Sequence, residues 1–511
     1  MKRGITLTIS NSKQVKFGAI LYYVLIVCTA LYGIIITPFI VSHLGSSNYG
    51  IYKTISSLSA SLAVIDLGVG GTIQRYVAKY IAEKNEDKIS NFVAMGLIIS
   101  IAICFAFAFV SIGLYFSLNL LYGKTLNAEQ MEIAKIVFCI SALTIVVHVF
   151  ENVFNGVVTG YNHFVFGNGI KVVLLAVRIV AIILFLSRSD SVVGLVALTL
   201  VINLLFALIE ALFVRAFIKL KIKLTKWEKG LFFEAGKYTV LMFLTSIVGQ
   251  ICTNLDNVVI GAIRGPELVT IYSIGLLIFA MFSQLSCGIS GVMLPTVTNV
   301  LNSENGEKKI IDLIIKAGRI QFLLLGAGVV GFLCIGKDFV YVWMGPGFED
   351  VYIITLVLII PALFELCINV CLSILQAKNL LVFRTISLCI SATINAIITI
   401  VLVKEWSYIG AAIGTAISYI LCSLISMNWY YHKKLKLPML KIYKGIIGKI
   451  VFCQIIAGVC LFVFSRFVKG SWFAIFLDVL CFCLIYLGTL FVFGLNKEEK
   501  RQLFFWKKKK E

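Results

Sequence analysis

The sequence predicts an all-α membrane protein with about fourteen transmembrane helices and both termini in the cytoplasm. The first observation is composition, because the 511 residues are 60% hydrophobic and 14% charged, whereas soluble domains are nearer half apolar and a quarter charged. The second is that apolar runs of about 20 residues, the length that spans a bilayer, recur from end to end. The third is that Lys and Arg alternate between rich and poor loops.

The apolar runs define the predicted spans one by one. The second run contains Lys53, Asp66 and several serines, so it should face the protein interior. Pro38 and Pro361 fall inside the first and tenth runs, where proline can kink a helix. The runs cover residues 18–41, 50–69, 92–118, 134–158, 164–187, 191–217, 235–262, 269–293, 318–343, 351–376, 380–403, 407–431, 446–469 and 471–494.

The basic residues fix the orientation of these spans. The N-terminus, the loops near 75–88, 219–229, 308–316 and 433–444, and the C-terminal tail are rich in Lys and Arg, whereas the intervening loops hold one or two each. A missed helix would invert this alternation downstream, so it supports an even count and cytoplasmic termini. The net charge of +20 is therefore interpreted as a topology signal, and no nucleic-acid partner is expected.

A weak internal repeat divides the chain into halves. Shifting the sequence by 220 residues aligns 40–88 with 260–308 and pairs Gly45 with Gly265 and Tyr52 with Tyr272. Chance identity in so biased a composition remains an alternative. The repeat predicts a six-helix half at 1–225, a second at 226–440, two extra helices at 441–495 and a basic tail at 496–511. Parallel halves of this kind are a transporter architecture. The larger inward loops, about 70–91 and 294–317, should form amphipathic surface helices.

Sequence motifs argue against an enzyme. The chain has no GxxxxGK[ST] loop, no GxSxG elbow and no HExxH pair. The four histidines are single, and the fourteen cysteines lie mostly inside apolar runs without zinc or disulfide spacing. We therefore expect no catalytic site, no metal and no bound cofactor.

Charges inside the spans are the remaining candidates for function. Lys171 and Arg178 lie seven residues apart in the fifth span and so share a helix face. This pair predicts a cationic wall that accepts a phosphate or pyrophosphate. The alternatives are pairing with a carboxylate such as Glu151, or snorkelling of Lys171 toward the cytoplasm.

Three carboxylates are candidates for coupling or gating. They are Asp66 before a glycine-rich stretch, Asp256 after Asn254, and Glu365 near the middle of the tenth span. Structural pairing is an equal alternative for each. Asp478 lies deep in the last span with no evident partner. Three further charges lie near the cytoplasmic ends of their spans and are expected to snorkel: Glu210, Arg319 and Arg384.

Three short stretches resemble a known family. They are 64–78 (VIDLGVGGTIQRYVA), 255–261 (LDNVVIG) followed by 269–272 (VTIY), and 44–50 (LGSSNYG). They are similar to the Wzx-type polysaccharide flippases of the multidrug/oligosaccharidyl-lipid/polysaccharide exporter superfamily. The resemblance implies an inner-membrane flippase for an undecaprenyl-pyrophosphate-linked oligosaccharide, such as an O-antigen (lipopolysaccharide) or capsule repeat unit. It also implies a cationic cavity, with which Lys171 and Arg178 are compatible.

The expected partners are therefore a lipid-linked oligosaccharide, membrane lipid and other polysaccharide-assembly proteins, in the bacterial inner membrane. A coupling cation or proton could offset the cost of moving anionic charge outward. Two other classes remain open. A drug/cation antiporter of the same superfamily should have twelve spans and an acidic cavity. A membrane glycosyltransferase or polymerase should carry a large outward loop, which this chain lacks.

Overall fold

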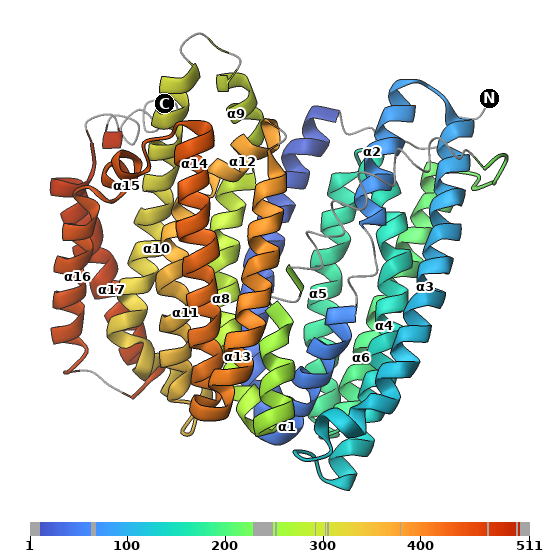
Figure 1. Cartoon of the computed structure of the whole chain (residues 1–511), viewed down its shortest axis with the longest axis horizontal. Helices are drawn as coiled ribbons and strands as arrows, with labels where there is room; N and C mark the ends of the chain where they lie inside the picture. Colours follow the sequence, from blue (N-terminus) through green and yellow to red (C-terminus); the bar gives the residue numbers. More distant parts are fainter. Residues whose placement is uncertain are drawn as a thin grey trace. The chain divides into compact units, whose positions relative to one another are not determined.

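The computed structural model is helical, as the sequence predicts, and its described residues contain no strand (Figure 1). The described residues are 11–62, 68–227, 249–250, 253–291, 293–301, 303, 306–378, 380–467, 470–496 and 499–500. Ten helices among them are long and apolar enough to cross a membrane, or eleven if the bent pair Met439–Ile447 and Ile450–Phe464 is one span. The predicted class, a multi-span α-helical membrane protein, is confirmed.

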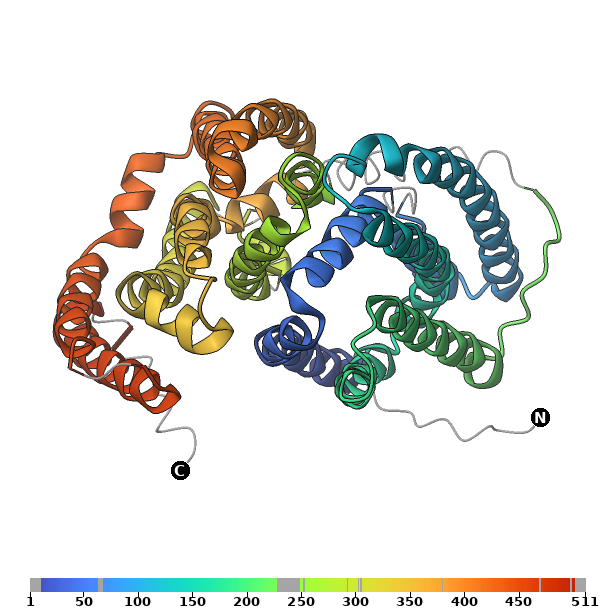
Figure 2. The ribbon, with the colours of Figure 1, turned by 90° about the horizontal axis from the view of Figure 1, so that it is seen from below.

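The chain divides into two compact units, Met1–Thr270 and Ile271–Glu511. Figure 2 shows the helices of each unit end-on. The first unit holds a helix over 253–264 and the elements α1 (Asn11–Leu62), α2 (Val69–Ala82), α3 (Glu86–Tyr122), α4 (Ala128–Gly160), α5 (Phe164–Leu186), α6 (Val192–Phe213) and the π-helix η2 (Val214–Ile218).

The second unit contains most of α8 and all later elements. These are α8 (Pro266–Gly291), α9 (Leu294–Leu301), α10 (Gly306–Met344), α11 (Asp350–Cys367), α12 (Val370–Ala377), α13 (Leu381–Ser418), η3 (Tyr419–Ser426), α14 (Met427–Leu435), α15 (Met439–Ile447), α16 (Ile450–Phe464), α17 (Trp472–Thr489) and η4 (Leu490–Gly494).

Two long helical stretches each contain two predicted spans. In α1 the backbone leaves helical geometry at Gly45 and remains helical at Pro38, so the break is at the glycine. In Figure 1 the dark-blue start of α1 runs down the molecule and its lighter-blue end runs back up. In α13 the break is at Trp406 and Ser407. The seventh span lies mostly outside the described residues, so the count of fourteen stays a prediction.

The internal repeat is visible in the backbone. Gly45 and Gly265, which the shift of 220 pairs, both adopt positive φ, at 76° and 96°. Only glycine adopts such angles readily. The same shift relates the first residue of α3, Glu86, to the first residue of α10, Gly306. One turn and one helix start therefore recur at the predicted shift of 220 residues.

Helix starts follow local side-chain chemistry. Asn85 accepts a hydrogen bond from the Lys88 N–H at the start of α3. Asn127 and Gln130 form a reciprocal capping box at α4. Such caps stabilise a helix by about 1 kcal/mol. Between its ends, α3 presents apolar side chains outward, with Phe109 81% exposed. An all-apolar outer face is what a lipid environment requires.

The helix α2 confirms the amphipathic helix expected in the loop 70–91, and α9 confirms a helix in the loop 294–317, while their inward placement stays a prediction. Val69, Ile73 and Val77 recur at helical spacing and are buried in one core cluster. A Cβ on Gly156 of α4 would lie 2.5 Å from the Gly70 carbonyl oxygen. The two backbones can approach this closely only because both positions are glycine.

The extra C-terminal helices attach to α10 through buried polar groups. Gln454 of α16 donates to the Phe322 carbonyl at 2.9 Å, and the Tyr486 hydroxyl of α17 donates to the Leu323 carbonyl at 2.9 Å. A Cβ on Gly326 would lie 2.4 Å from Gln454 Nε2. These contacts place the last helices in the second unit, while the predicted domain limits stay a prediction.

The snorkelling predicted for Arg319 is wrong. Its side chain is 7% exposed and forms a two-pronged ion pair with Glu499, at 2.7 Å and 3.0 Å. It also donates to the carbonyl oxygens of Gly445 and Gly494 at 3.2 Å and 3.0 Å. Sequence spacing cannot reveal this site because Glu499 is 180 residues away.

The Glu499 pair should make stability depend on pH. Burial opposes ionisation of Glu499, but hydrogen bonds from Arg319 and the Asn496 N–H outweigh it and hold the pKa of Glu499 below its ordinary value of 4.5. The stabilisation is therefore complete above that value and is lost as pH falls through the lowered pKa. We expect the melting temperature of detergent-purified protein to fall in that acid range. The Glu499→Gln variant should have a lower melting temperature than wild type at neutral pH. Below pH 5 its melting temperature should change less with pH than that of wild type.

Candidate functional site

The predicted pair Lys171 and Arg178 lies on α5, facing α6. Arg178 Nη2 donates to Asn203 Oδ1 of α6. Arg178 Nε is buried and has no hydrogen-bond partner among the described residues. Tyr32 of α1 lies within electrostatic reach of the guanidinium. A guanidinium has five N–H donors, and among the described residues the hydrogen bond to Asn203 uses one of them.

Lys171 lies two turns away, nearer the predicted cytoplasmic side. Its Nζ lies 5.9 Å from the centre of the Phe206 ring on α6, a weak cation–π distance. Glu210, one turn beyond Phe206, lies within electrostatic reach of Lys171. The wall is therefore cationic at Arg178 and mixed in sign at Lys171.

Glu210 is fully buried, so the prediction that it snorkels is wrong. Asn155 of α4 donates to Glu210 Oε1 at 2.7 Å, while Oε2 has no partner among the described residues. The sequence places Glu210 near a helix end but cannot tell which neighbour covers it. That neighbour is Asn155, which no sequence motif indicates.

The alternative pairing of the cations with Glu151 is not observed. Glu151 Oε2 lies 2.8 Å from His148 Nδ1 on the same helix, close enough for an ion pair although not aligned for a hydrogen bond. Within the described ranges, neither Lys171 nor Arg178 has a carboxylate oxygen within 4 Å. Neither cation therefore forms a close ion pair with a described carboxylate, although Glu210 lies within electrostatic reach of Lys171.

A small polar cavity of about 170 Å³ lies between α2 and α4. Gly68, Gly70 and Gly71 line one side, and Asn152 and Asn155 the other. The glycines belong to the 64–78 motif, and Gly70 among them packs closely on α4, where an added Cβ would lie 2.7 Å from the Asn152 carbonyl oxygen. Asp66, the carboxylate predicted from the same motif, lies outside the described residues.

A line of small residues joins α1 to the chain around Gly265, and we call it the outer seam. Thr270 Oγ1 donates to the Ser46 carbonyl at 2.6 Å, and Asn257 Nδ2 donates to Ser57 Oγ at 2.9 Å. Between these bonds, a Cβ on Gly50 would lie 1.8 Å from the Pro266 carbonyl oxygen.

A second glycine of the outer seam is equally enclosed. A Cβ on Gly261 would lie 2.5 Å from Thr54 Cγ2. Thr125, in the turn before α4, donates to the Gly261 carbonyl at 3.0 Å. The two segments therefore contact each other at four positions of α1 about one helical turn apart, Ser46, Gly50, Thr54 and Ser57, all inside the first compact unit. By the predicted topology, this seam lies on the outward side.

The outer seam is reciprocal. Ser46 pairs with Thr270 and Gly50 with Pro266, and the shift of 220 carries Ser46 onto 266 and Gly50 onto 270. Pairing of i with j and of j with i is what a two-fold axis produces. The seam thus joins equivalent positions of the two sequence repeats.

The other predicted carboxylates lie in different units. Asp256, 1% exposed, lies in the first unit next to Asn257 of the outer seam. Glu365 of α11 lies in the second unit, where it shares a hydrogen bond with Tyr419 and lies within electrostatic reach of Arg384. The contacts of Glu365 favour the structural alternative. Asp478 is 2% exposed, and its Oδ1 has no partner among the described residues.

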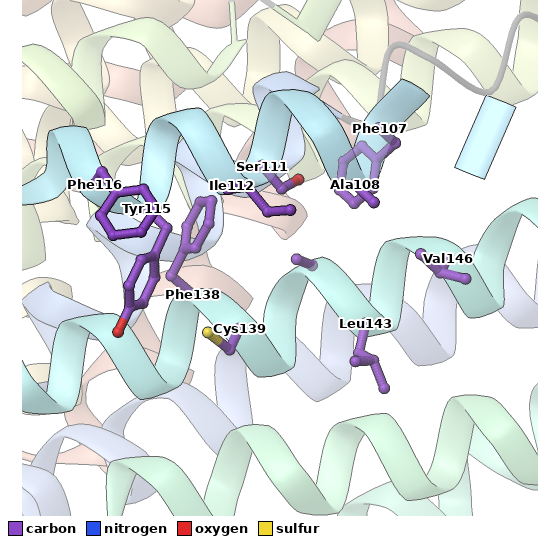
Figure 3. A pocket seen from close by; sticks show the side chains of 11 residues that line it. Phe107, Ala108, Ser111, Ile112, Tyr115, Phe116, Phe138, Cys139, Leu143 and Val146 are labelled. Carbon is purple, nitrogen blue, oxygen red and sulfur yellow. The ribbon is translucent and has the colours of Figure 1, made fainter. Parts of the chain in front are cut away.

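An apolar cavity of about 420 Å³ lies between α3 and α4 (Figure 3). Phe107, Ile112 and Phe116 of α3 face Phe138 and Leu143 of α4 across it. A lining of this kind suits hydrocarbon and would not stabilise a charged head group.

Metal chemistry finds no support in the described part of the chain. No group of three His, Cys, Asp or Glu side chains there is placed to hold an ion. Twelve cysteines are described and all are free thiols, most of them buried or partly buried in the helices. They behave as small apolar side chains.

Comparison with known proteins identifies the family of this chain. Residues 15–301 match the family described as Polysaccharide biosynthesis protein. A curated relative, "Probable flippase AglR" of Haloferax volcanii (strain ATCC 29605 and its equivalents), is 27% identical over 177 residues, which cover 34% of this chain and 37% of the relative. The match thus spans little more than a third of that relative.

Solved structures show the same fold. "Lipid II flippase MurJ, inward closed conformation" superposes with a TM-score of 0.68 at 16% identity, covering 92% of this chain and 98% of that one. An inward-facing multidrug resistance MATE transporter of the MOP superfamily gives 0.59 at 16%, covering 81% and 98%. A MOP superfamily transporter from Pyrococcus furiosus Vc1 gives 0.53 at 15%, covering 85% and 96%.

These matches are to flippases and transporters, and they confirm the resemblance drawn from the three sequence stretches. The chain therefore belongs to the polysaccharide biosynthesis protein family and has the fold of the multidrug/oligosaccharidyl-lipid/polysaccharide exporter superfamily.

Proposed function

We propose that this protein moves an undecaprenyl-pyrophosphate-linked oligosaccharide from the cytoplasmic to the outer leaflet of the bacterial inner membrane. The head group passes through the protein while the polyprenyl tail stays in lipid. Membership of the polysaccharide biosynthesis protein family supports a lipid-linked sugar as the substrate. The same membership makes other polysaccharide-assembly proteins the expected partners.

Arg178 is the observation on which the proposal rests. A cation in the middle of a span costs about 2.5 to 3.5 kcal/mol on the insertion scale, so it persists where it has a function or a partner. Arg178 has one hydrogen bond to a neutral amide and a buried Nε without a partner among the described residues. A planar guanidinium binds phosphate oxygens through paired hydrogen bonds. We assign it the pyrophosphate and Lys171 the preceding contact on the cytoplasmic side.

Alternating access would supply the movement, and the outer seam would be its outer gate. In the described conformation the seam is closed by direct backbone contact. Small residues allow the two segments to approach this closely. Because few large side chains interdigitate across the seam, the two segments can also separate. Parallel repeats rocking about such a contact would expose the cationic pair to each side in turn.

Coupling is also proposed. Carrying one negative charge outward against a negative-inside potential costs about 2.3 kcal/mol per 100 mV. A cation or proton moving the other way would offset this, and Asp66, Asp256 and Glu365 are the candidate sites. Asp256 has the best placement of the described two, because it is buried beside the outer seam.

The test is double neutralisation, Lys171→Gln with Arg178→Gln, in a deletion strain. We expect surface polysaccharide to fall at least tenfold with normal protein abundance in the membrane. The matched control is Lys124→Gln with Arg188→Gln, which removes two exposed cations elsewhere in the first unit. Wild-type polysaccharide in the first variant would refute the cationic-wall assignment.

A drug/cation antiporter is the second candidate, and the buried carboxylates Glu151 and Glu210 favour it. Such a protein would bind cations at these acids. Glu210→Gln with Glu151→Gln should then raise the drug sensitivity of the cell. We expect drug tolerance to be unchanged in this variant and in the deletion strain.

A further inference from the structure

Three lysines from distant parts of the sequence meet at one cavity of the second unit, which we call the trilysine pocket. Lys308 lies in the first turn of α10, Lys378 caps the end of α12, and Lys436 follows α14. All three line a single cavity of about 290 Å³. Figure 1 shows α9, α12 and α14 reaching the same end of this unit.

The fold brings these lysines together through packing of short helices. The helix α9 packs against α10 and α12, and α10 packs against α12. After α14, Lys436 adopts a left-handed conformation with φ 54°, which ends the helix. The next residue, Leu437, is then 4% exposed, whereas Lys436 stays exposed.

The charge at the rim of the trilysine pocket is uncompensated among the described residues. The described residues that line it include no carboxylate. None of Lys308, Lys378 and Lys436 has a carboxylate oxygen within 4 Å in the described ranges. The acid nearest in sequence among the described side chains, Asp312, is exposed one turn along α10 and does not line the cavity. Like charges held together in this way favour an anionic ligand.

The floor of the pocket is apolar. Ile310, Ile374 and Leu437 are each less than 5% exposed and belong to the core of the unit. Leu301, Ile311 and Leu435 complete the lining. A free inorganic anion would use only the rim. A molecule with a phosphate head and a hydrocarbon body would use both rim and floor.

By the predicted topology, the three lysines lie on the cytoplasmic side, at the level of the head groups. We propose that the trilysine pocket binds the phosphate head group of an anionic membrane phospholipid, separately from the transported substrate. The substrate contacts assigned above lie in the first unit, whereas this pocket lies in the second. Each lysine near an anionic leaflet contributes about 1 kcal/mol, so three together favour binding by about a hundredfold.

The test uses purified full-length protein in zwitterionic nanodiscs, titrated with phosphatidylglycerol and measured by native mass spectrometry. The variant is Lys308→Gln, Lys378→Gln and Lys436→Asn, since asparagine tolerates the left-handed conformation. We expect one tightly retained phosphatidylglycerol in wild type and about a hundredfold weaker retention in the variant. The matched control, Lys434→Gln, Lys441→Gln and Lys444→Gln, removes the same charge from exposed positions of the same unit.

Two further arms identify the source of the phosphate. Replacing the three lysines with arginine should preserve retention, which separates loss of charge from loss of fold. Inorganic phosphate and undecaprenyl pyrophosphate, added as competitors, should not displace the retained lipid. The proposal would be overturned if the control variant lost phosphatidylglycerol as readily as the pocket variant. It would also be overturned if wild type retained no lipid, or if undecaprenyl pyrophosphate displaced the retained lipid.

Discussion

Gly50→Leu is expected to abolish transport while leaving the protein in the membrane. The Cβ alone would lie 1.8 Å from the Pro266 carbonyl oxygen, and the rest of the leucine side chain has no space. Overpacking of this kind costs about 1 to 3 kcal/mol. Because the cost falls only on the closed outer seam, it shifts the population toward the open conformation by up to about 150-fold.

The measurement is accessibility at the seam together with surface polysaccharide. Ser57→Cys places a thiol where the side chain is 6% exposed. A membrane-impermeant maleimide added outside should label it slowly in the wild-type background and rapidly with Gly50→Leu. The strain without Ser57→Cys gives the labelling of native cysteines.

Two variants control for loss of fold. Gly113→Leu on α3 adds the same side chain where nothing lies within 4 Å of the new Cβ, and transport should be normal. Thr270→Val removes the hydrogen bond to Ser46 but adds little volume to the seam, so it should give a smaller effect, since a bond of this kind contributes about 1 kcal/mol. Unchanged labelling and transport in Gly50→Leu would show that the seam is not a gate.

Arg319→Met is expected to have the largest effect on stability. It leaves Glu499 without its partner and removes donors from two carbonyl oxygens. Breaking a buried ion pair from one side costs about 3 to 5 kcal/mol. We expect a clear fall in melting temperature in detergent and earlier proteolysis of the C-terminal segment.

Two further substitutions locate the cause. Arg319→Lys keeps the charge but not the two-pronged geometry, so it should recover only part of the loss. Lys309→Gln removes an exposed cation from the same helix and should be neutral. A melting temperature for Arg319→Met equal to that of Lys309→Gln would contradict the structural role of this pair.

The sequence predicts the membrane fold well because apolar length and loop charge act locally. The helices α3, α4, α5 and α6 coincide with four of the six spans predicted for the first half, and the breaks at Gly45 and Gly265 fall at positions that the predicted repeat pairs. At Pro38 the backbone of α1 keeps helical dihedral angles, and the break in this helix is at Gly45.

The candidate site is predicted only in part, since it depends on which helices meet. Lys171 and Arg178 share a face by spacing alone. The bond of Arg178 to Asn203 and that of Asn155 to Glu210 join different helices, so periodicity could not reveal them. The ion pair of Arg319 with Glu499 cannot be predicted for the same reason. The glycines of the outer seam lie in the stretches 44–50 and 255–261 that resemble the family. Only the contact distances show that a larger side chain would not fit at these positions.

The central claim is translocation of a lipid-linked sugar, and reconstitution tests it most directly. Purified protein in liposomes would receive a polyprenyl-pyrophosphate-linked sugar with a fluorophore on the sugar, and dithionite added outside would bleach the accessible label. We predict that bleaching extends to the inner-leaflet label with wild-type protein and not with the Lys171→Gln and Arg178→Gln double variant. Bleaching confined to the outer leaflet with wild type, or equal transfer of labelled phosphatidylcholine, would contradict a flippase specific for lipid-linked sugar.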